Sequence, residues 1–463
     1  MQHSSTYRSL TVAVALGIGA APVQAQLTLG DALRRADRAA YANRIAAGNA
    51  EAQRAKTLVP LKAILPSVRF EAGFIRTTDP IGVFGSTLRQ RDVTQANFEP
   101  QRLNYPAPIA NYQSGVVLEQ PLFNADAWTG RAAAMHAADA TRAAEEWTRL
   151  STRADVVRAY YGAVLARERV ATLQAAARAA HAHVAQAESM VRQGLVTKSD
   201  ALLAAVRAGD VDAQLAEAQA GAATALRRLA VLLGGDGTPT PADLDAPAGL
   251  PSAARILAEV ATDTAAVPAQ SRADVSAASE ASAAARADAR RARATLLPRV
   301  NGFARYDWNS PTRPYTGDRN WTVGVMASWS LFAGLGDLAD VRETAGRASV
   351  AQVQAEAALA NARLEAEDSR TALAVALTRL TIAARAVAQS AEAHRIITRK
   401  YEGGLATVAE LLDAASAETA TTLALSGAQY GAITAVADRR RALGADPGTL
   451  ASLDATTIAA GHP

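Results

Sequence analysis

The residues best placed for chemistry in this 463-residue chain lie in two glycine-led turns. Thr197 precedes Asp200 by three positions, and Thr407 precedes Glu410 by three. This is the spacing of a capping box, in which a carboxylate accepts a hydrogen bond from a backbone N–H at the start of a helix. The capping box gives Asp200 and Glu410 a purely structural role. It does not explain Asp413, which lies three residues after Glu410 and shares a helix face with it.

No catalytic or metal-binding constellation accompanies these carboxylates. The six histidines are scattered. His181 and His183 are two residues apart on a predicted helix, so they do not face one another. The sequence has no phosphate-binding glycine loop and no nucleophile elbow. It also has no cysteine, so the lack of disulfides says nothing about the redox compartment. We therefore expect no enzyme, no cofactor and no metal site.

The composition favours long helices. Alanine dominates and aromatic residues make up only 5% of the chain, and alanine loses no side-chain entropy in a helix. Because alanine cannot fill a wide core, we expect an extended bundle with thin seams. The formal net charge of +4 is mild and comes without a basic run, so binding to nucleic acid is not implied.

Residues 1–25 are typical of an export signal. His3 and Arg8 flank a short apolar run, and small residues at Val23 and Ala25 precede a cleavage site. Beyond this leader we expect no apolar stretch of about 18 residues, hence no membrane-spanning helix. Any membrane crossing must then be made by strands of a closed barrel.

The chain also repeats itself, with a period of about 210 residues. Three short segments recur in the same order, and they fall at turns, outside the alanine tracts. The pairs are ILPSV at 64–68 with LLPRV at 296–300, GVV at 115–117 with GVM at 324–326, and GLVT at 194–197 with GLAT at 404–407.

Each half therefore follows one plan. An opening helix (29–62, then 267–295) ends at a Leu-Pro, since proline does not continue a helix. A β-hairpin follows, and then a proline-free helix (126–192 and 336–402) and a returning helix. Repeat 1 is predicted at 26–235, with its β-hairpin at about 66–123 and its helical hairpin at about 126–235. A connecting segment follows at 236–265. Repeat 2 is predicted at 266–447, with its β-hairpin at about 298–332 and its helical hairpin at about 336–445, and a C-terminal tail at 448–463 ends the chain.

The predicted strands alternate apolar and polar residues. One interpretation is a half-buried sheet in a soluble protein. Against it, tryptophan and tyrosine gather at the strand ends, as in the aromatic girdles of lipid-facing barrels. The polar positions of the strands favour a barrel with a water-filled interior over a packed one. They are Arg69, Glu71, Asn301 and Arg305.

Four strands cannot close a barrel, and open strand edges are not tolerated in lipid. Two copies of the chain would supply eight strands, whose interior is filled by side chains. Three copies would supply twelve and leave a lumen. The residue patterns do not separate three copies from four.

The sequence resembles the TolC-like outer-membrane efflux proteins from about Leu27 to Pro447. The resemblance rests on the opening LTLGDAL at 27–33, both Leu-Pro strand entries and both Gly-Leu-x-Thr turns. It implies a mainly α protein with transmembrane β. The protein would then be a homotrimer whose twelve-stranded barrel in outer-membrane lipid continues as an α-helical barrel through the periplasm. A periplasmic adaptor and an inner-membrane transporter are the implied partners. Two positions depart from the family pattern. Arg44 follows Asn43 where the family has a proline, and the second half has Ser330 at the position where the first half has Pro121.

The resemblance also implies roles for the turns. Glu410 and Asp413 would form carboxylate rings at a periplasmic constriction, and Tyr401 would link to Ser199 and Asp200. The arginine of a second link is absent, because Ala406 stands there. The turns would be docking sites for the adaptor, through Gly194, Leu195, Thr197, Gly404, Leu405 and Thr407.

Two other classes stay open at this point. One is a soluble periplasmic coiled-coil or adaptor protein, whose strands would form a small β domain. The other is an envelope-associated enzyme, which no motif supports. As a duct, the protein would serve drug or metal efflux or type I protein secretion, with the substrate chosen by its inner-membrane partner.

Overall fold

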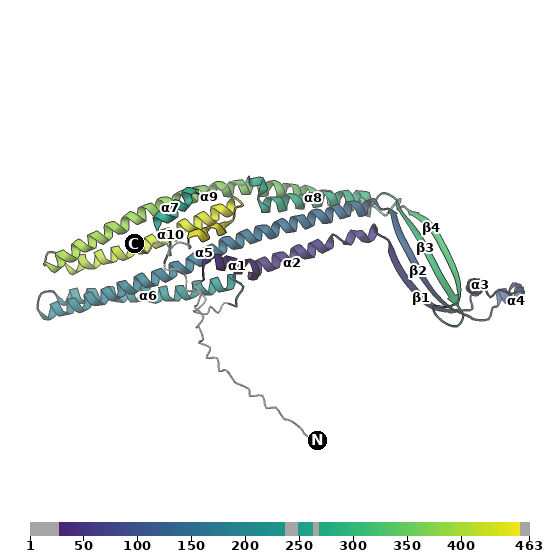
Figure 1. The fold of residues 1–463 in the computed structure, drawn as a ribbon, viewed down its shortest axis with the longest axis horizontal. Coiled ribbons are helices and arrows are strands. Elements are labelled where there is room, and N and C mark those ends of the chain that lie inside the picture. Colours follow the sequence, from purple (N-terminus) through teal and green to yellow (C-terminus); the bar gives the residue numbers. More distant parts are fainter. Residues whose placement is uncertain (1–26, 237–248, 263–267, 454–463) are drawn as a thin grey trace, which may run out of the picture.

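The computed structural model describes residues 27–236, 249–262 and 268–453. The predicted export signal lies outside the described residues, as do parts of the connecting segment and of the C-terminal tail. The described chain is a long rod of helices with a sheet at one end (Figure 1).

Two long helices run along the rod. α5 spans Ala125–Arg192 (68 residues) and α9 spans Gly336–Glu402 (67 residues). At 1.5 Å per residue each is about 100 Å long. Neither contains proline, so the hydrogen-bond ladder is not interrupted. Both helices begin and end within one residue of the positions predicted from the sequence.

Each long helix is paired with a returning helix of 35 residues, α6 (Lys198–Leu232) on α5 and α10 (Val408–Ala442) on α9. We call α5 with α6 hairpin 1, and α9 with α10 hairpin 2. Both turns lie at the end of the rod away from the sheet (Figure 1), which we call the tip. α10 also packs on α5, so the hairpins are joined.

Shorter helices cover the part of the rod next to the sheet. They are α1 (Leu29–Ala39), α2 (Tyr41–Lys56) and α8 (Ala273–Ala294), and a further helix, α7 (Ala253–Thr262), lies in the connecting segment. α1 and α2 pack against α5, and α8 contacts both α5 and α9.

The single opening helix predicted over 29–62 is wrong. The chain turns at Ala40, whose ψ of 132° is not helical, and a 3₁₀ turn covers Val59–Ala63. The buried side chain of Asn43 stabilises the break, because its amide donates to the carbonyl of Ala36 at 3.1 Å. In the second half the helix begins at Ala273, six residues later than predicted, because Arg272 is extended.

The sheet contains four antiparallel strands in the order β1-β2-β3-β4. Their bounds are Ser67–Thr77, Ile109–Phe123, Arg299–Ser310 and Asp318–Ser328. The four strands predicted from the sequence are confirmed. β4 ends earlier than expected, so Trp329 and Leu331 lie beyond it. Beside Pro121 the pairing of β2 with β3 shifts register.

The two faces of the sheet differ in chemistry. The register gathers charges on one face, where Arg305 lies 3.5 Å from Glu71 and Arg69 lies 3.4 Å from Glu119. The opposite face is apolar and largely exposed in the single chain. It includes Val68, Phe70, Phe74, Leu118, Tyr306, Trp321, Val323 and Val325. Within the described chain, β1 and β4 each have one unpaired edge.

The long connection between β1 and β2 is itself partly helical. It contains α3 (Pro80–Arg89) and α4 (Pro100–Asn104). α3 begins where the Asp79 carboxylate accepts from the backbone of Gly82 at 2.7 Å, with proline in the first turn as helix starts favour. The Gln90 amide then donates to the carbonyl of Ala110 at 2.8 Å, which fastens this segment to the end of β2.

The main core is a thin seam at the middle of the rod. α1, α5, α10 and a 3₁₀ segment over Pro447–Leu453 meet there. Tyr160 and Tyr161 are fully buried and pack edge to face at 5.3 Å. The Tyr160 hydroxyl donates to the carbonyl of Leu27 at 3.1 Å. The expectation of close-packed seams is therefore confirmed.

The expectation that no apolar stretch of about 18 residues follows the leader is wrong. Among the described residues one helix, α9, is long and apolar enough in composition to cross a membrane, with a mean hydropathy of 1.4 in its most apolar window. Alanine and leucine raise this value although arginine recurs along the helix. A crossing needs only about 20 residues, whereas α9 has 67 and packs along α8 and α10.

Candidate gate at the helical tip

Hairpin 1 turns through a glycine and a capping box. α5 ends near Gly194, whose φ of +73° is accessible to glycine without strain. The Leu195 N–H donates back to the carbonyl of Met190 at 2.9 Å. Thr197 then caps α6, since its N–H donates to the Asp200 carboxylate at 3.0 Å and its hydroxyl accepts from the Asp200 backbone.

Hairpin 2 turns in the same way. Gly404 has a φ of +72°, and the Leu405 N–H donates to the carbonyl of Lys400 at 2.8 Å. The Thr407 N–H donates to the Glu410 carboxylate at 2.7 Å. Both capping boxes predicted from the sequence are confirmed.

The two turn leucines are exposed. Leu195 is 65% exposed and Leu405 is 81% exposed. A glycine turn does not require a leucine after it, so these two side chains present apolar surface at the end of the rod. The structure thus places the predicted docking residues together at the tip.

An apolar cluster joins the hairpins just behind the turns. We call it the tip cluster, and it consists of Ala187, Ala204, Tyr401, Val408, Leu411 and Leu412. Its members come from α5 and α6 on one side and from α9 and α10 on the other. Burial of apolar surface between the hairpins therefore stabilises their contact.

Tyr401 lies in this cluster and is 7% exposed. In the single chain its hydroxyl donates to the sulfur of Met190 at 3.2 Å, rather than to Ser199 or Asp200. Both expected acceptors are already occupied, because the Ser199 hydroxyl shares a hydrogen bond with Thr197 and the Asp200 carboxylate belongs to the capping box. Burial raises the pKa of Tyr401, and the charge of Asp200 raises it further.

Asp413 contacts the other hairpin. Its carboxylate lies 3.6 Å from the guanidinium of Arg207 on α6. Glu410 is fully exposed, and hydrogen bonds from the backbone and hydroxyl of Thr407 lower the pKa of its carboxyl group. Glu410 is thus ionised at neutral pH, as a carboxylate ring requires.

Reasoning from the sequence missed two residues, Arg207 and Met190. Each lies on an alanine-rich helix, and no local motif marks it. Arg207 reaches Asp413 because α6 packs near α10. Helical periodicity alone does not predict that packing.

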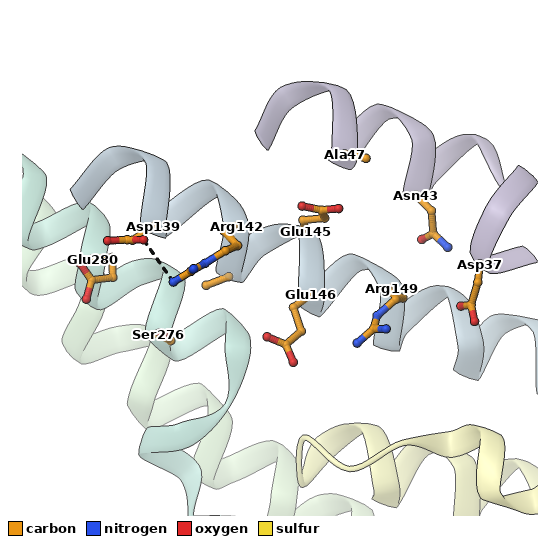
Figure 2. A pocket seen from close by; sticks show the side chains of 11 residues that line it. Asp37, Asn43, Ala47, Asp139, Arg142, Glu145, Glu146, Arg149, Ser276 and Glu280 are labelled. Atoms are coloured by element: carbon orange, nitrogen blue, oxygen red, sulfur yellow. Dashed lines mark ion pairs between the residues drawn. The ribbon is translucent and has the colours of Figure 1, made fainter. Parts of the chain in front are cut away.

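A hollow in the surface lies far from the tip. A cavity of about 650 Å³ opens between α2, α5 and α8, with carboxylates and arginines along its walls (Figure 2). Three of its carboxylates already have partners. Asp37 with Arg153 and Glu280 with His136 join neighbouring helices, whereas Asp139 pairs with Arg142 within α5. Within the described ranges, no three His, Asp or Glu side chains are arranged to hold a metal ion.

Comparison with known proteins agrees with this architecture. The family model described as outer membrane efflux protein matches the chain twice, over residues 63–235 and 268–445. Each match falls within one of the two halves found as a sequence repeat. No protein of curated function matches the chain.

Solved structures share the fold at low sequence identity. A membrane protein from Pseudomonas aeruginosa has a TM-score of 0.74 at 20% identity, with 90% of each chain covered. The CmeC outer membrane channel of Campylobacter jejuni has a TM-score of 0.74 at 17% identity, over 90% of this chain and 85% of CmeC. The outer membrane protein VceC of Vibrio cholerae has a TM-score of 0.73 at 19% identity, over 90% of this chain and 96% of VceC.

The family model covers well over half of the sequence, in two copies. The chain belongs to the outer membrane efflux protein family.

Proposed function

We propose that three copies of this chain form the exit duct of an export system. A periplasmic adaptor and an inner-membrane transporter would supply its substrates, as in multidrug efflux or type I protein secretion. The family consists of outer-membrane transport channels that extend into the periplasm, and the chain is not an enzyme.

The observation that carries this proposal is the sheet. Its apolar face is exposed, its other face is charged, and its outer strands β1 and β4 are unpaired within the described chain. Lipid tolerates strands only when no edge is left open. Pairing of β1 from one copy with β4 of the next closes the sheet, and three copies give a twelve-stranded barrel with a polar lumen.

A cross-linking experiment tests this closure, because the chain has no native cysteine. Within one chain β1 and β4 are three strand spacings apart, about 14 Å, which is beyond the reach of a disulfide. We therefore combine Phe70→Cys on β1 with Cys at Trp321, Val323 or Val325 on β4. Oxidation is expected to link at least one pair into dimers and trimers.

Phe70→Cys with Tyr306→Cys is the matched control. Both positions lie on the apolar face, and β2 separates their strands, so this pair is expected to stay unlinked. A monomer in the soluble periplasmic fraction, with no cross-link in any pair, contradicts the duct and favours the soluble adaptor.

At the tip, we propose that Glu410 and Asp413 line the constriction and that Tyr401, Ser199 and Asp200 belong to the contacts that close it. The adaptor would dock on the two turns. Support for docking comes from the exposed Leu195 and Leu405, which have no packing role in the single chain.

A further inference from the structure

A cavity of about 610 Å³ lies between the two hairpins, behind the tip cluster. Side chains from α5, α6, α9 and α10 line it, and most of them are small and apolar. Its charged or titratable members are His183, Arg207, Asp210, His394 and Glu418. The proposed gate accounts for Arg207 alone, through Asp413.

His394 is held in one orientation within hairpin 2. Its Nδ1 is hydrogen-bonded to the Glu418 carboxylate. A carboxylate only accepts, so Nδ1 carries a proton and donates it. Nε2 is buried and has no hydrogen-bond partner among the described residues. The imidazole thus has one ring nitrogen fixed by hairpin 2 and one that no described residue contacts by a hydrogen bond.

His183 faces the same cavity from hairpin 1. Burial lowers the pKa of His183, and the charge of His394 lowers it further. The charge of His394 thus opposes protonation of His183 across the boundary between the hairpins. His181, two residues earlier, is instead exposed, and its Nε2 lies within hydrogen-bond distance of the Asp212 carboxylate inside hairpin 1, at 3.0 Å.

We propose that His183 and His394 form a proton-binding site that opens the tip on acidification, by separating hairpin 1 from hairpin 2. This inference rests on the proposed role of the tip as the gate of a duct. The ligand is the proton itself, and the site is the pair of imidazoles that face one cavity from two hairpins.

The direction of the pH effect follows from the burial of His183 between the hairpins. With the hairpins together, the pKa of His183 is below its ordinary value, whereas separation exposes the ring to water and restores that value. Above that ordinary value both arrangements are neutral and pH has no effect. As the pH falls through this range the separated arrangement binds more protons, so it is favoured. Each pH unit by which burial lowers the pKa of His183 shifts the equilibrium about tenfold.

The other charged groups around the cavity do not remove this effect. Arg207 of α6 is positive and pairs with Asp413 of α10. Glu418 of α10 pairs with His394 inside its own hairpin, so it does not hold the hairpins together. Asp210 of α6 lies on the same hairpin as His183 and likewise makes no bridge between them.

The test is conductance of the full-length channel in planar bilayers, from pH 7.5 to pH 5. We expect the occupancy of the open state to rise as the pH falls below about 6.5, the ordinary pKa of histidine. His183→Gln removes the proton site itself and is expected to flatten the rise severalfold, and His394→Gln removes the charge that lowers the pKa of His183 and is expected to weaken the rise as well. His181→Gln is the matched control, two residues away on the same helix, and its response should equal that of the wild type.

A second measurement follows the hairpins directly. Spin labels on Val206→Cys of α6 and Ala417→Cys of α10 report their separation, which should lengthen on acidification and stay constant when His183→Gln is added. A wild-type protein that conducts at no pH contradicts the duct itself. A duct that conducts, with the same pH response in wild type and His183→Gln, overturns the proton site alone.

Discussion

The guanidinium of Arg207 lies 3.6 Å from the carboxylate of Asp413 and joins α6 to α10 across the two hairpins. Asp413 was expected to face a lumen as part of a carboxylate ring. In the single chain it also has a partner on the opposite hairpin. An arginine from α6 thus supplies a cross-hairpin ion pair in a chain where Ala406 occupies the position of the link arginine.

Removing this ion pair should loosen the tip by a small amount. Both side chains are at least half exposed, and exposed pairs contribute about 0.2–1 kcal/mol. Arg207→Gln is therefore expected to raise the open-state occupancy by roughly 1.5- to 5-fold per protomer in bilayer recordings, less so at high salt. The exchanged pair Arg207→Asp with Asp413→Arg should restore most of the closed state. If the exchanged pair has the same open-state occupancy as Arg207→Gln, the ion pair between Arg207 and Asp413 is contradicted.

Truncating Tyr401 should have a larger effect than removing its hydroxyl. Tyr401→Ala removes a buried ring from the tip cluster, and such truncations cost about 3–5 kcal/mol. Tyr401→Phe keeps the packing and loses only the weak contact with the Met190 sulfur. We expect Tyr401→Ala to give a strongly conducting channel and Tyr401→Phe to resemble the wild type. Equal effects would show that a hydroxyl bond to Ser199 or Asp200 of a neighbouring copy holds the tip closed.

Local rules were enough to predict much of this fold. Proline-free alanine tracts predicted the two long helices. Leu-Pro steps followed by alternating apolar and polar residues predicted the four strands. Gly194 and Gly404, with the threonines that follow them, located both turns and both capping boxes. These features depend on the preferences of neighbouring residues, which the sequence displays directly.

Features that depend on contacts between distant helices were not predictable. The break at Ala40 is stabilised by Asn43 reaching back to Ala36, and neither glycine nor proline marks it. Arg207 and Met190 gained their roles from the crossing of the hairpins. His183 and His394 are separated by 211 positions in the sequence, and only the packing of α5 against hairpin 2 brings them to one cavity.

The carboxylates of the constriction should make conductance sensitive to cations. Three copies of Glu410 and Asp413 would attract multivalent cations into the lumen. Glu410→Ala with Asp413→Ala is expected to weaken block by added divalent cations. Glu410→Gln alone separates this effect from loss of the Arg207 ion pair. An unchanged response to cations in both variants contradicts the ring.

The same block should persist into mildly acidic solution. Hydrogen bonds from Thr407 lower the pKa of Glu410 from its ordinary value of 4.5, so its charge is lost only as the pH falls below that value. Thr407→Val removes the hydroxyl donor and should move the loss of block to higher pH. The measurement is divalent-cation block of the conductance from pH 6 to pH 3.5. Coincident curves for wild type and Thr407→Val contradict the role of the hydroxyl.

Replacing the turn leucines should abolish adaptor docking without affecting the barrel. Leu195 and Leu405 are exposed and pack against nothing in the tip cluster, so Leu195→Ser with Leu405→Ser should leave folding and trimer formation intact. Burying each leucine against a partner contributes about 1.5–3 kcal/mol. The double variant should therefore lose at least about a hundredfold in affinity for the adaptor encoded with this channel, measured by surface plasmon resonance. Leu338→Ser is the matched control, since Leu338 is an exposed leucine at the sheet end of α9. Because docking uses the tip alone, that variant should bind as the wild type does, and equal loss in both variants would place the adaptor elsewhere on the rod.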